Sequence, residues 1–122
     1  MAKVTGIGGV FFKSKDAKAL TAWYAKHLGI TIAPWGGAVL RWNEDKAADK
    51  GATAWNIEDT HSDKFSPSES SFMINYRVDD LLGMLENLQA AGVEIVKTEF
   101  DQFGKFAWIM DPDGNKLALW ES

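Results

Sequence analysis

The sequence predicts an α+β fold in which two βαβββ modules follow each other in one domain. An amphipathic helical pattern occurs once in each half of the chain, and strand-like runs flank both patterns. The helical stretches Asp16–Gly29 and Asp79–Gly92 are equal in length, and each begins at a capping aspartate and ends at a glycine. This correspondence indicates an internal repeat. Neither half alone can bury both its helix stripe and its sheet face, so we expect the two modules to share one domain.

The first module is expected to begin with a strand at Val4–Lys13, where β-branched, aromatic and glycine residues are mixed. Ser14 or Asp16 can cap the helix that follows. The apolar side of this helix comprises residues at helical spacing, namely Leu20, Trp23, Tyr24, His27 and Leu28. Three short strands are expected next, at Ile30–Ala33, Ala38–Trp42 and Thr53–Ile57.

The second module repeats this order. A strand at Ser71–Val78 leads to a helix that Asp79 or Asp80 can cap, with an apolar stripe of Leu81, Met84, Leu85 and Leu88. The remaining strands are expected at Val93–Phe100, Lys105–Met110 and Lys116–Trp120. Asp111–Asn115 (DPDGN) joins the last two, because its proline, glycine and aspartates have the chemistry of a tight turn.

The whole chain, residues 1–122, is therefore interpreted as one domain. Its modules span about residues 1–58 and 71–122, and the polar, turn-rich residues 58–70 connect them.

Alternation along the strands predicts which side chains line a cup on the side of each sheet away from its helix. In the first strand, Val10 and Phe12 would face the core. In the second module, Ile74, Tyr76, Val78, Leu117 and Leu119 would do the same. The cup would then contain Gly9, Phe11, Lys13, Met73, Asn75, Arg77, Ala118 and Trp120.

Composition excludes several classes of function. The net charge of −4, with charges of both signs interspersed, gives no basic stripe for nucleic acid. No apolar run has membrane-spanning length, and the first residues lack the layout of a signal peptide. The absence of cysteine rules out disulfide and thiolate chemistry. We expect a cytoplasmic protein that binds neither nucleic acid nor membrane.

Two further stretches carry a resemblance to a known family. Trp23–Gly29 (WYAKHLG) resembles an aromatic-Tyr-x-x-x-Leu-Gly motif, and Asp111–Glu121 (DPDGNKLALWE) resembles a characteristic turn followed by a strand that often carries Glu. With the duplicated βαβββ pattern, they resemble the vicinal oxygen chelate superfamily, which includes glyoxalase I, bleomycin-resistance proteins, fosfomycin-resistance enzymes and extradiol dioxygenases. The resemblance implies curved sheets around a cleft and covers nearly the whole chain.

Enzymes of that superfamily hold a divalent metal through His, Glu or Gln at four cup positions. The corresponding positions here are Gly9, Trp55, Met73 and Ala118. None offers an imidazole or carboxylate donor. We therefore expect no metal and no other cofactor. His27 and His61 are interpreted as a helix-edge and a loop residue.

The expected ligand is an apolar or aromatic small molecule, because the chain has six tryptophans and seven phenylalanines, several of them near the cup. The candidate binding residues are Phe11, Lys13, Trp55, Met73, Asn75, Arg77 and Trp120. Two structural alternatives remain: Trp55 plugs the cup, or Arg77 pairs with an internal carboxylate or lies at the rim. Trp23 and Trp108 are expected in the core.

Function is predicted to be metal-free binding or sequestration, similar to bleomycin-resistance proteins. No catalytic residue is identified. The alternatives are a metal-dependent lyase or dioxygenase whose ligands are registered differently, and a protein with a filled cup whose surface serves a partner. We also expect a homodimer, in which modules pair within or between chains.

Overall fold

The computed structural model describes residue 3, residues 7–47, residue 49 and residues 51–122. The described residues form one four-stranded sheet with the strand order β1-β4-β3-β2. Strand β1 runs parallel to β4, and the other two pairs are antiparallel. The elements in chain order are α1 (Ala17–Leu28), the 3-10 helix η1 (Trp42–Glu44), β1 (Ile74–Arg77), α2 (Leu81–Ala90), β2 (Ile95–Asp101), β3 (Gly104–Met110) and β4 (Lys116–Glu121).

The second half of the chain forms the βαβββ unit that the sequence predicts, as the order β1-α2-β2-β3-β4. Asp80 begins α2 by accepting a 3.1 Å hydrogen bond from the Gly83 amide. Beyond the helix end, Gly92 has a φ of 82°, a left-handed conformation that favours glycine. The predicted α+β class is therefore confirmed.

The first half differs from its prediction. Helix α1 forms as expected, with Asp16 accepting from the Ala19 amide at 3.1 Å and Gly29 at its end with a φ of 70°. Among the described residues, however, none of the four expected strands forms; Val4 to Gly6 lie outside those residues. The expected second sheet is thus missing from the described part of the chain. A strand needs a hydrogen-bonded neighbour, and the sheet pairs only β1 to β4.

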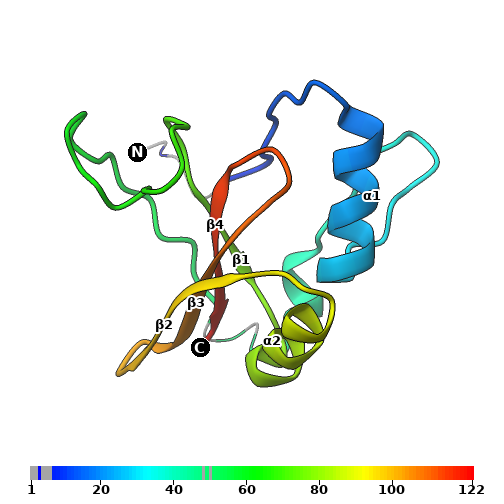
Figure 1. The fold of residues 1–122 in the computed structure, drawn as a ribbon. Coiled ribbons are helices and arrows are strands. Elements are labelled where there is room, and N and C mark those ends of the chain that lie inside the picture. The colour runs from blue at the N-terminus through cyan, green and yellow to red at the C-terminus, as the bar shows by residue number, and fades with distance from the viewer. Residues whose placement is uncertain (1–2, 4–6, 48, 50) are drawn as a thin grey trace.

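The hydrophobic core lies between one face of the sheet and the two helices. Figure 1 shows α1 and α2 on the same side of the sheet. Helix α1 contributes Leu20 and Tyr24, and the other buried members come from α2, β3 and β4: Leu81, Leu85, Leu88, Ala107, Ile109, Leu117 and Leu119. Tyr76 and Val78 pack against this cluster. The strand alternation predicted for Leu117, Leu119, Tyr76 and Val78 is correct.

The connector is attached to the start of β4. The Lys116 ammonium donates a 2.8 Å hydrogen bond to the Lys64 carbonyl oxygen, and the Ser70 hydroxyl donates one of 2.7 Å to Asn115 Oδ1. Burial lowers the pKa of Lys116. Over the residues that the structure covers, no helix is both long and apolar enough to cross a lipid bilayer.

Candidate functional site

The far face of the sheet, opposite the helices, carries the side chains that alternate with the core residues. Strand register defines two rows across this face, because directly paired residues point to the same side. One row comprises Arg77, Trp120, Phe106 and Glu99. The other comprises Asn75, Ala118, Trp108 and Lys97. The far face therefore combines three large aromatic rings with charged residues on the edge strands.

Three of these rings form a continuous aromatic row, defined here as Trp120, Phe106 and Trp108. The Phe106 and Trp120 rings are stacked with centroids 5.6 Å apart and planes 5° apart. Phe106 and Trp108 are stacked at 5.9 Å and 15°. Stacked rings of this kind stabilise each other beyond their burial alone. The row is half-buried, so part of its apolar surface stays accessible.

A cation lies at each end of the aromatic row. The Arg77 guanidinium is 4.7 Å from the Trp120 ring centroid, and the Lys97 ammonium is 5.6 Å from the Trp108 centroid. The two ends differ in mobility: the Lys97 side chain is 61% exposed, whereas that of Arg77 is 20% exposed. The Lys97 end can therefore rearrange at lower cost than the Arg77 end.

Trp120 is held in place by the β2–β3 turn. Its indole N–H donates a 2.9 Å hydrogen bond to the Phe103 carbonyl oxygen. Gly104 follows with a φ of 128°, and a side chain there would collide with the Glu121 backbone oxygen and come within 3.0 Å of Trp120 Nε1. The turn thus needs glycine at this position to seat the tryptophan.

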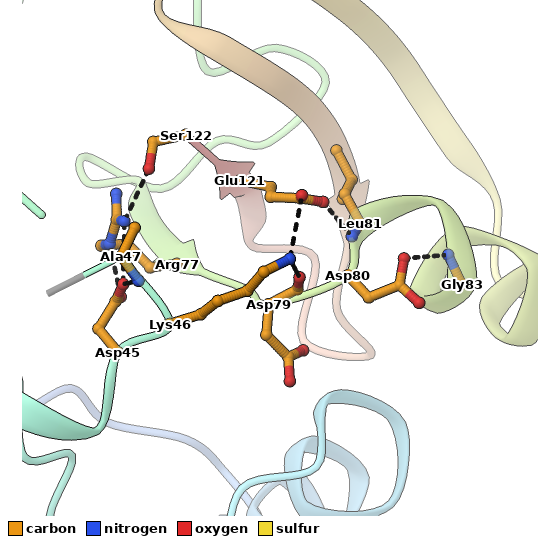
Figure 2. Close-up of polar contacts among 10 residues, drawn as sticks. All are labelled: Asp45, Lys46, Ala47, Arg77, Asp79, Asp80, Leu81, Gly83, Glu121 and Ser122. Carbon is orange, nitrogen blue, oxygen red and sulfur yellow. Dashed lines mark hydrogen bonds and ion pairs between the residues drawn. The ribbon is translucent and has the colours of Figure 1, made fainter. Parts of the chain in front are cut away.

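Arg77 is paired within the chain. Its Nε donates to Asp45 Oδ2 at 2.7 Å, its Nη2 donates to Asp45 Oδ1 at 3.1 Å, and Nη2 also reaches the Ser122 hydroxyl at 3.0 Å (Figure 2). The hydrogen bonds from Arg77 hold the pKa of Asp45 below its ordinary value, and those to Asp45 raise the pKa of Arg77. Both shifts indicate a charged pair at neutral pH.

The next residue, Lys46, attaches the same loop to the start of α2. Its ammonium donates to the Asp79 carbonyl oxygen at 3.0 Å and lies 3.7 Å from Glu121 Oε2. Glu121 Oε1 in turn accepts a 2.9 Å hydrogen bond from the Leu81 amide, at the first residue of the helix (Figure 2). Two neighbouring loop residues thus hold both ends of this charged cluster.

Comparison with known families assigns this architecture. The family model described as the Glyoxalase/Bleomycin resistance protein/Dioxygenase superfamily matches residues 6–119. The chain belongs to this superfamily. A search of curated protein sequences finds no match.

Solved structures of similar fold support the same assignment. A protein from Bacillus anthracis with a glyoxalase family name is 14% identical, with a TM-score of 0.56 and coverage of 98% of this chain and 99% of that one. Lactoylglutathione lyase from Agrobacterium tumefaciens is 16% identical (TM-score 0.53, coverage 89% and 87%). TnmS3, an antibiotic binding protein from Streptomyces sp. CB03234, is 20% identical (TM-score 0.52, coverage 88% and 87%).

These likenesses show the fold. For two other matched structures, the chain covers only 45% and 54% of the matched chain.

The metal positions of the glyoxalase superfamily do not fit a metal in this chain. Ala118 lies on the far face between Asn75 and Trp108, is 2% exposed, and has no side-chain donor atom. Gly9, Trp55 and Met73 likewise lack imidazole and carboxylate groups. In the described part of the chain, no three His, Cys, Asp or Glu residues gather where they could hold a metal ion.

The structure brings three of the sequence-predicted binding residues together on the far face: Asn75, Arg77 and Trp120. Met73 directly precedes β1. Phe11 is 90% exposed and Trp55 is 74% exposed, so neither residue fills a cup. Lys13 lines a shallow open depression of about 370 Å³ with Ser14, Lys15, Asp113 and Asn115.

Sequence reasoning missed Phe106, Trp108 and Lys97. Trp108 was expected in the core, but Ala107 and Ile109 occupy the core positions of β3, and alternation turns Trp108 to the far face. That alternation was the available signal. Because all five residues from Lys105 to Ile109 except Lys105 are apolar, hydrophobicity alone did not distinguish the two faces.

Proposed function

We propose that this superfamily member binds a planar aromatic or apolar small molecule at the aromatic row without using a metal. The row of Trp120, Phe106 and Trp108 is the observation that carries the proposal. Ligand sites are commonly apolar surfaces with a few placed polar groups. The far face has this composition, since Arg77 and Asn75 border the rings.

Binding at the row is favoured by the mobility of Lys97. An incoming ring can displace this exposed ammonium from Trp108 and stack in its place, because a solvated cation over a ring contributes only about 0.5–1 kcal/mol. Stacking of a flat ring on an aromatic side chain contributes about 1–3 kcal/mol. The exchange is therefore favourable. The antibiotic-binding name of TnmS3 supports small-molecule binding as a use of this fold.

Equilibrium dialysis with three 2-substituted naphthalenes tests the proposal. The probes carry an isopropyl, an acetyl or a carboxylate group on the same ring system. At least one should bind the unaltered chain, and Trp120→Ala and Trp108→Ala should each weaken that binding by about 1 kcal/mol or more. Trp35→Ala is the matched control, because Trp35 is 67% exposed and belongs to a different segment. Absence of binding by all three probes would overturn the proposal.

Metal independence needs a separate experiment. The purified protein is incubated with nickel, zinc or manganese ions, desalted, and assayed for bound metal by elemental analysis. We expect no stoichiometric retention, because the four family positions supply no suitable donors. One equivalent of metal that a chelator removes would instead support the alternative, a metal-dependent lyase or dioxygenase of the glyoxalase type.

A further inference from the structure

The guanidinium of Arg77 has one donor group left over. Asp45 accepts from Nε and Nη2, and Ser122 accepts from Nη2. Nη1 is buried and has no acceptor among the described residues. Buried donors without a partner are uncommon because each loses its hydrogen bond to water. An unfilled donor beside the Trp120 ring is therefore a specific recognition element for whatever lies on the aromatic row.

The charge around this donor is already balanced. Asp45 neutralises Arg77, and Glu121 lies opposite Lys46, so two cations meet two carboxylates in this cluster. A ligand carboxylate at Nη1 would be attracted by Arg77 and repelled by Asp45 at comparable distance, and these two interactions largely cancel. It would also lose its hydration on entering the site. Charge therefore gives an anionic ligand no advantage here.

A neutral acceptor meets neither cost. A carbonyl oxygen accepts the Nη1 hydrogen bond, leaves the Arg77–Asp45 pair intact, and requires far less desolvation than a carboxylate. We propose that the aromatic ligand of this site carries an uncharged oxygen acceptor, such as a ketone or amide carbonyl, that pairs with Arg77 Nη1. This inference rests on the proposed binding at the aromatic row and specifies the class of ligand.

The three naphthalene probes distinguish the possibilities, because their substituents are similar in size but differ in charge and hydrogen bonding. At pH 7 we expect 2-acetylnaphthalene to bind about tenfold more tightly than 2-isopropylnaphthalene, the gain from one hydrogen bond to a charged donor. We expect 2-naphthoate to bind no more tightly than the isopropyl compound. A naphthoate that binds more tightly than the ketone would overturn the inference and leave binding at the row standing. Failure of all three probes would overturn the proposed function itself.

Two substitutions test the roles of the pair. Asp45→Asn removes the opposing charge at nearly constant shape, so it should raise the affinity for 2-naphthoate about tenfold while changing that for 2-isopropylnaphthalene little. Arg77→Met should abolish the preference for the ketone over the isopropyl compound. A ketone preference that survives Arg77→Met would overturn the inference. Circular dichroism checks the fold of each variant, and if Asp45→Asn does not fold, the order of the three probes on the unaltered chain decides alone.

Discussion

The Tyr24 hydroxyl donates a 2.8 Å hydrogen bond to Asp111 Oδ2, and this contact joins helix α1 to the turn before β4. Asp111 is 5% exposed. It also accepts from the Asp113 amide, the Asn115 amide and Asn115 Nδ2, each at 2.9 Å. Burial and the bond to Asp111 raise the pKa of Tyr24, so its hydroxyl stays protonated and remains a donor. One buried carboxylate thus organises the turn and holds the helix of the first half to the sheet of the second.

Tyr24→Phe should lower the free energy of unfolding by about 1–3 kcal/mol. The substitution keeps the ring but leaves a buried carboxylate oxygen with one donor fewer, and such groups are costly to leave unsatisfied. Urea unfolding followed by circular dichroism measures the change. Asp113→Asn is the control in the same turn, because Asp113 is exposed and should change stability by less than about 0.5 kcal/mol. Equal effects of both substitutions would contradict this account of the network.

The sequence was informative where local chemistry decides the structure. Asp111–Asn115 forms its turn with Gly114 at a φ of 78°, and Asp16 and Asp80 cap the helices as their positions suggest. The pairing of Arg77 with Asp45 was not predictable in detail, because the partners are far apart in the chain and Asp45 lies in a loop. The first-half strands also exceeded what local pattern decides, since β structure depends on a partner that a pattern does not specify.

The Asp45–Arg77 pair should make stability depend on acid pH. The pKa of Asp45 is lowered in the folded chain, so its contribution is complete above its unfolded value near 4 and is lost as pH falls through the folded value. Asp45→Asn should therefore be less stable than the unaltered chain at pH 7, by about 1–3 kcal/mol, and the difference should shrink towards pH 3.

Urea unfolding at pH 7, 5 and 3 measures this convergence. Asp79→Asn is the control, because the Asp79 carboxylate makes no hydrogen bond within the described residues and points away from the cluster in Figure 2. A constant difference between Asp45→Asn and the unaltered chain across this range would mean that the pair does not carry the acid sensitivity.

Gly104→Ala should disturb the seat of Trp120. A methyl group at Gly104 collides with the Glu121 backbone oxygen in addition to straining a φ of 128°, whereas a methyl group at Gly114 meets no atom within 4 Å and strains only a φ of 78°. Gly114→Ala should therefore cost about 1–2 kcal/mol and Gly104→Ala more. Near-ultraviolet circular dichroism should also change only for Gly104→Ala, because the tryptophan signal reports the packing of the aromatic row. An unchanged tryptophan spectrum in that variant would remove the turn from the site.

Apolar side chains of the first half lie exposed on segments that the sequence marks as strands. Phe11 is 90% exposed, Leu40 67%, Trp55 74% and Ile57 77%. The sheet itself ends at β1 and β2, whose outer edges have no strand beside them among the described residues. Unpaired edges and exposed apolar segments both favour association, and a second copy of this chain offers the matching segments and edges.

We therefore predict a homodimer in which first-half segments of one chain pair with the sheet of the other or with their counterparts. Light scattering at micromolar concentration should give twice the mass of 13.5 kDa, and Phe11→Ser together with Ile57→Ser should shift the population towards monomer. Leu82→Ser is the matched control, because Leu82 is 52% exposed but lies on the formed helix α2. Shortening the connector should change the oligomeric state if halves are exchanged between chains, since a short connector forbids folding back within one chain. A mass of 13.5 kDa that persists on concentration would exclude the dimer.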